Sequence, residues 1–339
     1  MGVTIRDVAQ HAGVSISTVS RVLNQTAPVN PEKHRRVMTA VDALGYRPNP
    51  VAISLLKQST GIVGVVLPSI SGEFFAELLL GLDDTVQEHG YLLLVSASDR
   101  HEAEFKAALK SISRRVDGFL IMAPEITPKV AHELLEEDIP VVFVNTPVYD
   151  EMFDVFHFDN YGGMYALTSH LLERGHQRIA FIKGPTAAYD AQDRLRAYRD
   201  AMRQLGGEYV EALEFDGDFS AECGYRAAQL LMQSDTQATA LIGANDLCAQ
   251  GALRYLLLAG VRVPEDMALA GFDDIPSARY STPSLTTVRV PIRNIAMQVV
   301  HHLIARISDP DACSRRHHCH PVQLVIRESS GFRMLKSSA

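Results

Sequence analysis

The chain has few cysteines and no long apolar run. Its 339 residues include four irregularly spaced cysteines, a pattern that favours reduced thiols over a disulfide framework. No apolar stretch approaches the length of a membrane-spanning helix. The N-terminus has no hydrophobic segment of the kind found in secretory signals. We therefore expect a cytoplasmic protein that does not associate with a membrane.

Sequence motifs typical of enzymes are also missing. The chain contains no HExxH pair, no phosphate-binding glycine loop and no recognisable Ser, His and Asp arrangement. Its C-terminal end has no leucine heptad repeat, which argues against a coiled-coil tetramer. We expect a protein that is not an enzyme and carries no cofactor.

Charge is divided unevenly along the chain. Up to Thr60, seven basic residues stand against three acidic ones, so this segment carries a net charge of +4. Because the whole chain carries −8, the remainder carries −12. A basic segment ahead of an acidic body favours binding of phosphates by the segment alone.

The first 24 residues have the pattern of two short helices joined by a turn. Thr4 can cap the first helix, with Asp7 as its capping-box partner. Gly13 lets the backbone leave that helix, and Ser15 can start the next one. With a third helix that opens at Asn30-Pro31, this is a helix-turn-helix pattern. Helix pairs joined by glycine also occur in proteins that never bind nucleic acid, so the basic charge adds necessary support.

The second of these helices has a surface suited to the DNA major groove. Small polar groups and a single arginine let a helix approach base edges. We expect three exposed residues to read bases: Ile16, Ser17 and Arg21. Four more are expected to hold phosphates: Thr4, Ser15, Ser20 and Asn24.

From Ile62 onward, apolar strands alternate with amphipathic helices. The predicted strands are residues 62–67, 91–95, 118–123, 140–145, 178–183, 238–242, 267–272 and 321–327. The predicted helices are residues 74–89, 162–174, 194–205, 221–232, 247–259 and 291–307. This alternation implies parallel sheets flanked by helices, and its two runs of similar length imply two lobes with a cleft between them.

Polar and aromatic side chains collect where the predicted strands end. Ligands in open α/β sheets bind beyond the carboxyl ends of the strands. A set of carboxylates, amides and one guanidinium could hold the vicinal hydroxyls of a sugar, while aromatic rings pack on its apolar face. The expected ligand-binding residues are Phe74, Asn145, Asp190, Arg194, Phe219, Asn245 and Asp273. Asp246 is expected to cap a helix rather than to bind a ligand, and Asp274 has a similar claim to a structural role.

These motifs together resemble the LacI/GalR family of repressors. The resemblance rests on residues 4–24, on Leu44-Gly45-Tyr46-Arg47-Pro48-Asn49 and on residues 51–55, and it continues through nearly the whole chain. Asp190 with Arg194, and the stretch from Ser277 to Arg289, look closest to the galactose-repressor branch. The resemblance implies an all-α DNA-binding head, a hinge helix and a two-lobed body like that of periplasmic binding proteins.

The resemblance also implies domain boundaries and partners. The expected domains are residues 1–47 for the head, 48–60 for the hinge and 61–339 for the body. Within the body, the N-lobe covers about 61–160 and 290–320, and the C-lobe about 161–289 and 321–335. In the family the hinge helix pairs with its copy and wedges a leucine into the DNA minor groove, which here implies Leu55 with Ala52 beside it. Ile53 departs from the arginine that many members carry.

The expected function is therefore that of a homodimeric repressor of carbohydrate-utilisation genes. It would bind palindromic double-stranded operator DNA, and a small sugar in the interlobe cleft would modulate that binding. A nucleoside or another corepressor remains an alternative effector, and a sugar-binding protein that does not bind DNA is an alternative class.

One cluster near the C-terminus invites a metal interpretation. It runs Cys313-Ser314-Arg315-Arg316-His317-His318-Cys319-His320. Zinc sites use paired ligands that close to four, and no second cysteine pair stands elsewhere. We expect no metal site here and a solvated loop between the last helix and the last strand.

Overall fold

The computed structural model describes residues 3–24, 27–47, 59–97, 102–124, 126, 129, 133, 139–148, 151–309 and 316–331. The chain divides into two compact units, Met1–Thr60 and Gly61–Ala339. We call these units the head and the body and describe each separately. No helix among the described residues is both long and apolar enough to cross a bilayer.

The head contains three helices around a small apolar core. They are α1 (Ile5–Ala12), α2 (Ile16–Asn24) and α3 (Pro31–Leu44). Thr4 and Asp7 form the expected capping box, and Gly13 ends α1 in the left-handed conformation with φ 60°. Val8, Val19 and Val37, one from each helix, are fully buried in the shared core. The predicted helix-turn-helix head is confirmed.

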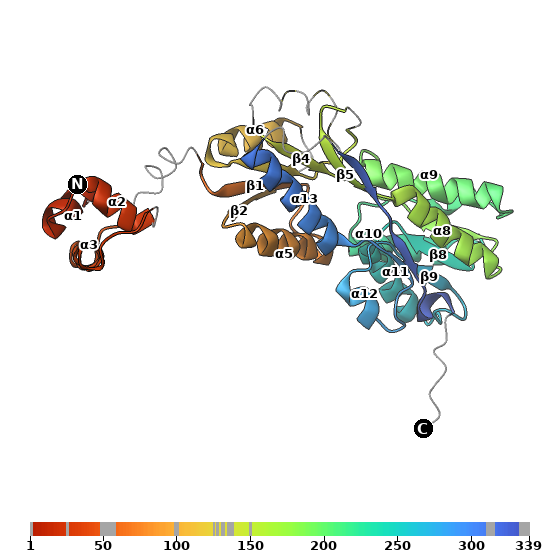
Figure 1. Cartoon of the computed structure of the whole chain (residues 1–339). Coiled ribbons are helices and arrows are strands. Elements are labelled where there is room, and N and C mark those ends of the chain that lie inside the picture. Colours follow the sequence, from red (N-terminus) through yellow and green to blue (C-terminus); the bar gives the residue numbers. More distant parts are fainter. Residues whose placement is uncertain are drawn as a thin grey trace. The chain divides into compact units, whose positions relative to one another are not determined.

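The body contains two parallel sheets. The first has the order β11-β5-β4-β3-β1-β2, with every neighbouring pair parallel. The second has the order β7-β6-β8-β9 and is also parallel. The strands of the first sheet are β1 (Ile62–Leu67), β2 (Leu92–Ala97), β3 (Gly118–Ile121), β4 (Val141–Val144), β5 (Asp154–Phe158) and β11 (His317–His320). Those of the second are β6 (Ile179–Ile182), β7 (Glu214–Phe215), β8 (Ala240–Gly243) and β9 (Ala268–Ala270). We call the parts built on these sheets the first and the second lobe (Figure 1).

Helices cover both faces of each sheet because alternate strand residues point to opposite sides. In β6, Phe181 joins a cluster that includes α8 and α9, whereas Ile182 packs with α10 and α11. In β1, Val65 lies against α5 and α13, and Val66 lies against α6. The helices of the first lobe are α5 (Glu73–Glu88), α6 (Glu102–Ile112) and α13 (Ile292–Ser308). Those of the second are α8 (Asn160–Glu173), α9 (Tyr189–Gln204), α10 (Ala221–Met232), α11 (Asp246–Leu258) and α12 (Pro276–Tyr280). The predicted two-lobed α/β body is confirmed.

The chain passes between the lobes several times. A short antiparallel pair, β10 (Thr287–Arg289) with β12 (Gln323–Val325), accompanies these passages. The remaining short elements are the 3-10 turns Ser113–Arg115, Glu211–Leu213 and Glu328–Ser330.

The C-terminal cluster does not form the loop that we expected from its sequence, although His317, His318 and Cys319 are exposed to solvent as expected. Residues His317–His320 form β11, which pairs in parallel with β5 at the edge of the first sheet. His320 is 3% exposed and stacks on Phe156. The predicted final strand 321–327 is reduced to Gln323–Val325. Cys313 lies outside the described residues, and those described hold no group of three or more His, Cys, Asp or Glu that could bind a metal.

Two further differences affect the ligand site. Helix α9 begins at Tyr189, five residues before the predicted start at Arg194. Asp190 and Arg194 therefore lie one turn apart on the same helix. The sequence pattern also missed β5, which begins with an aspartate and has a histidine between its apolar residues.

Candidate functional site

The head presents one face of α2 to solvent. Ile16 is 44% exposed, and Ser17 and Arg21 are exposed beside it. Positions 16, 17, 20 and 21 share a face of a helix because residues four apart lie nearly above one another. This face combines short side chains with one guanidinium, which is the chemistry expected at major-groove base edges.

The residues expected at phosphates differ in how their side chains are engaged. Thr4 caps α1, and the Ser15 hydroxyl accepts the Thr18 N–H at 3.2 Å. Asn24 Nδ2 donates to Ser20 Oγ at 3.2 Å, so these two side chains hold each other. The predicted hinge residues Ala52 and Leu55 lie outside the described residues.

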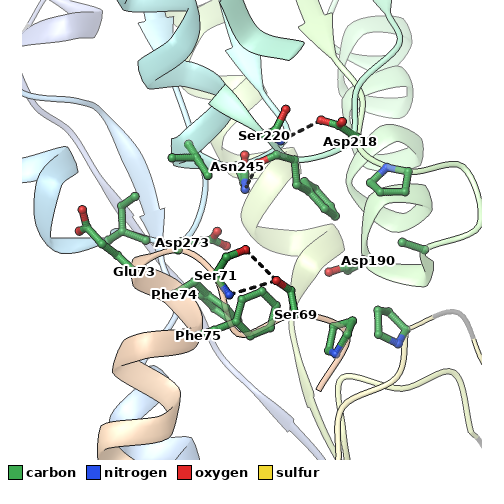
Figure 2. Close-up of a pocket in the computed structure, with 18 of the residues that line it drawn as sticks. Ser69, Ser71, Glu73, Phe74, Phe75, Asp190, Asp218, Ser220, Asn245 and Asp273 are labelled. Atoms are coloured by element: carbon green, nitrogen blue, oxygen red, sulfur yellow. Dashed lines mark hydrogen bonds between the residues drawn. The ribbon is translucent and has the colours of Figure 1, made fainter. Parts of the chain in front are cut away.

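A cavity of about 280 Å³ lies at the carboxyl ends of the strands in the body. The segment after β1 and the start of α5 form one wall. In it the rings of Phe74 and Phe75 pack edge to face, with their centroids 5.4 Å apart. The opposite wall comes from the second lobe and includes Phe219 and Asn245. Figure 2 shows Asn245 among the lining residues. Both lobes therefore contribute to one cavity, as expected for an interlobe ligand site.

Arg194 is the centre of a buried polar network next to this cavity. Its guanidinium donates to Asn160 Oδ1 at 3.0 Å, to the Ala244 carbonyl at 2.7 Å and to Asp273 Oδ1 at 3.4 Å. The same group lies 3.8 Å from the ring centroid of Phe272, in a cation–π contact. A guanidinium carries five N–H groups, so two donors remain beyond these three contacts within the described part of the chain.

Two carboxylates accompany this guanidinium in the cavity. Burial raises the pKa of Asp273 to about 7, although the charge of Arg194 acts in the opposite direction. Burial likewise raises the pKa of Asp190, against the charge of Arg194 and hydrogen bonds from its neighbours. A hydroxyl that donates to either carboxylate would stabilise its ionised form.

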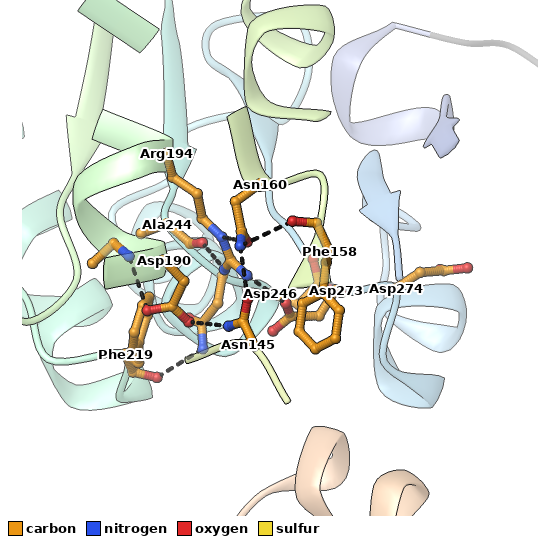
Figure 3. A network of polar contacts seen from close by, with 12 residues as sticks. Asn145, Phe158, Asn160, Asp190, Arg194, Phe219, Ala244, Asp246, Asp273 and Asp274 are labelled. Atoms are coloured by element: carbon orange, nitrogen blue, oxygen red, sulfur yellow. Dashed lines mark hydrogen bonds and ion pairs between the residues drawn. The ribbon is translucent and has the colours of Figure 1, made fainter. Parts of the chain in front are cut away.

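Asn145 does not line the cavity, contrary to our expectation. It is fully buried, and its Nδ2 donates to Asp190 Oδ2 at 3.3 Å. Asn160 Nδ2 in turn donates to Asn145 Oδ1 at 3.0 Å. The two amides thus form a bridge from Asp190 to Arg194, which fixes the orientation of both cavity residues (Figure 3).

The other expected ligand residues do line the cavity: Phe74, Asp190, Arg194, Phe219, Asn245 and Asp273. Asn245 also has a structural role, since its Oδ1 accepts the Cys248 N–H at 2.9 Å and so caps α11. Its Nδ2 donates to the Phe219 carbonyl at 3.1 Å, which ties the cap to the aromatic wall.

Neighbouring carboxylates hold the second lobe together instead of facing the cavity. Asp246 is fully buried and accepts the Ile275 N–H at 2.9 Å. Asp274 pairs with Arg289 at 2.6 Å and also with Arg327. Both are structural, as expected, but the predicted cap is wrong: Asn245, and not Asp246, caps α11.

The backbone around the cavity is strained at several side-chain-bearing residues. Five non-glycine residues of the described chain have positive φ: Asn145, Phe219, Gln237, Asp273 and Asp274. Asn145, Phe219 and Asp273 lie in the network or at the cavity, and Asp274 follows Asp273 directly. Such conformations persist only where surrounding contacts hold them.

Several lining residues and one supporting residue were not predicted from the sequence. The lining residues are Ser69, Ser71, Glu73, Phe75, Asp218 and Ser220. Most of them stand beside a predicted strand end or helix start, so proximity to a predicted site residue was the available signal. Asn160 follows β5, and without that strand nothing placed it near Arg194.

Comparison with known proteins identifies both parts of the chain. Residues 4–49 match the model of bacterial regulatory proteins, lacI family, and residues 168–330 match the periplasmic binding protein-like domain. The ribose operon repressor of Halalkalibacterium halodurans is 32% identical over 96% of this chain and 97% of that protein. The transcriptional repressor PurR of Edwardsiella ictaluri is 34% identical over 96% of each chain.

A solved structure extends this similarity to the arrangement of elements. The Lac repressor dimer, bound to operator and the anti-inducer ONPF, matches with a TM-score of 0.86 and 27% identity. The match covers 97% of this chain and 99% of that one. The chain belongs to the lacI family of bacterial regulatory proteins and is a DNA-binding transcriptional repressor, not an enzyme.

Proposed function

We propose that this repressor controls carbohydrate-utilisation genes and that a monosaccharide in the body cavity modulates its operator affinity. Ribose is the first candidate, because the arrangement of Arg194 between Asp190 and Asp273 fits a ring that carries several hydroxyls. This arrangement is the observation on which the proposal depends.

A sugar matches the cavity in two respects. Its hydroxyls donate to the two carboxylates and accept from the guanidinium, so each charged group finds a partner. Its apolar ring face packs against the aromatic walls formed by Phe74, Phe75 and Phe219. The ribose operon repressors among the relatives are consistent with this assignment.

A purine base or nucleoside is the alternative effector. Aromatic walls suit a flat base as well as a sugar ring. However, a base presents ring nitrogens and carbonyls that need N–H or O–H donors. Asp190 and Asp273 can donate only while protonated, whereas each sugar hydroxyl can donate to their ionised forms and accept from Arg194. The paired carboxylates therefore favour the sugar.

The repressor is proposed to act in the cytoplasm as a homodimer on palindromic DNA. Apolar side chains remain exposed on α10 and α11, among them Leu230 at 56% and Leu258 at 59%. Leu92 of the edge strand β2 is 65% exposed. Exposed apolar surface of this kind is typical of protein interfaces. In this proposal Ile16, Ser17 and Arg21 read bases in each half-site.

Calorimetric titration of the full chain tests the effector. The chain has no tryptophan, so tryptophan fluorescence cannot report binding. Ribose, other monosaccharides, purine bases and nucleosides would be titrated separately. We expect ribose or a close relative to bind and to change the affinity for an operator selected from random DNA, measured by anisotropy. Binding of a purine without any sugar would overturn the sugar assignment.

Ribose binding should also depend on pH through Asp273. With a pKa of about 7, its carboxyl is partly protonated at neutral pH. Sugar hydroxyls that donate to it favour the ionised form, so we expect tighter binding as the pH rises from 6 to 8 and proton release on binding, with a slope of at most about tenfold per pH unit. Calorimetry in buffers of different ionisation enthalpy measures the proton release.

The matched control for this experiment is Asp273→Asn. We expect it to bind ribose more weakly and with a much shallower pH profile, the remainder coming from Asp190. An unchanged profile would assign the titration to another group.

A further inference from the structure

Two cysteines of the second lobe are in contact beside the cavity. Cys223 Sγ and Cys248 Sγ lie 3.1 Å apart, and both residues are free cysteines. Cys223 stands in the first turn of α10 and Cys248 in the first turn of α11. Neither residue takes part in the repressor function described above.

The two helices hold this pair in place through close backbone contact. A Cβ built on Gly224 would lie 1.9 Å from the Cys248 carbonyl oxygen, and one on Gly251 would lie 1.8 Å from the Ala221 carbonyl oxygen. Only glycine permits so close an approach. A disulfide has an S–S distance of about 2.05 Å, so the sulfurs need to close by only about 1 Å.

The two thiols differ in exposure and in pKa. Cys223 is partly exposed, and a hydrogen bond from Cys248 lowers its pKa to about 7. Cys248 is buried, and its pKa is raised by the same contact and by burial. Cys223 is therefore the accessible nucleophile, and Cys248 is the adjacent thiol.

Each cysteine is joined to the cavity by hydrogen bonds of its backbone N–H and of its thiol, and both thiols donate to the Ser220 carbonyl. Ser220 Oγ accepts the Cys223 N–H at 3.1 Å, and Asn245 Oδ1 accepts the Cys248 N–H at 2.9 Å. Ser220 and Asn245 both line the cavity. A covalent bond between the sulfurs therefore links the two capped turns that form this wall.

We propose that Cys223 and Cys248 form a reversible disulfide when a hydroperoxide oxidises the repressor. The Cys223 thiolate attacks the peroxide, an S–O bond forms, the O–O bond breaks, and water or an alcohol leaves with the proton. Cys248 then attacks the Cys223 sulfenic acid, the S–S bond forms, and the hydroxyl leaves as water with the Cys248 proton. Two thiols are oxidised and one peroxide is reduced.

Peptide mapping of the full chain tests the disulfide directly. Trypsin cleavage after Arg226 places the cysteines on peptides 204–226 and 227–254. The background variant Cys313→Ser/Cys319→Ser removes the other two thiols. After hydrogen peroxide and alkylation, we expect these two peptides to be linked, and a dithiol reductant to release them. In Cys248→Ser we expect Cys223 to accumulate as sulfenic acid that dimedone labels.

Two results would overturn the proposal. One is recovery of both peptides unlinked, with each cysteine alkylated or Cys223 carried on to sulfonate. The other concerns the cavity wall. The disulfide is expected to slow amide hydrogen exchange in both capped turns, and unchanged exchange would show that the disulfide does not affect this wall. Neither measurement requires a sugar, so a failure of the ribose assignment would leave both tests intact.

Discussion

Arg194→Gln is expected to bind ribose roughly 100-fold more weakly than the unaltered chain, since charged hydrogen bonds contribute about 1.5–3 kcal/mol each. The guanidinium supplies charged N–H donors at the cavity and lies beside Asp190 and Asp273. Glutamine retains an N–H donor but removes the charge and the planar fork. Operator binding should persist without a ligand, whereas the response to ribose should be lost.

Arg196→Gln is the matched control for this change. Arg196 lies two residues further along α9, is 62% exposed and pairs with Asp193 on the surface. We expect ribose affinity and response to remain as in the unaltered chain. Thermal unfolding of both variants separates loss of binding from loss of fold. If Arg194→Gln responded to ribose normally, the cavity would not be the effector site.

Arg21→Ala is expected to abolish the preference for operator over unrelated DNA. An arginine that contacts a guanine with both nitrogens contributes about 1–3 kcal/mol of discrimination. A homodimer loses this contact in both half-sites, which gives about 2–6 kcal/mol in total. Binding to unrelated DNA should continue and should still weaken with salt, because phosphate contacts carry it.

Competition anisotropy with operator and scrambled duplexes measures this preference. Arg226→Ala removes the same charge from the body, where Arg226 is 71% exposed, and should leave the preference unchanged. Equal operator preference in Arg21→Ala and the unaltered chain would show that Arg21 does not read bases.

Local rules predicted those parts of the fold that depend on neighbouring residues. The capping box of Thr4 and Asp7 forms as expected, and α10 spans Ala221–Met232 as its pattern predicted. The sequences of α1 and α10 each show a capping residue followed by regularly spaced apolar residues, which is the pattern that predicts a helix. Helix α9 was predicted to start too late because its N-cap Ala188 makes no side-chain hydrogen bond.

Long-range contacts account for what the sequence could not show. Asp154 interrupts the apolar pattern of β5, yet it is fully buried because Arg306, far along the chain, donates to it at 2.9 Å. Asn145 stands at a strand end as expected of a ligand residue, but its distant partners Asp190 and Asn160 turn it inward. Position along the chain predicts which residues reach the site and not which of them face the ligand.

The positive φ values around the cavity have a consequence for how the repressor can evolve. Conformations of this kind cost about 1–3 kcal/mol each, so glycine at Phe219 or Asp273 would relieve part of that cost. The same substitutions would remove the aromatic wall and a carboxylate of the site. Selection for a more stable body would therefore act against the ligand response. Variants that become more stable and still respond to the ligand must gain their stability elsewhere in the fold.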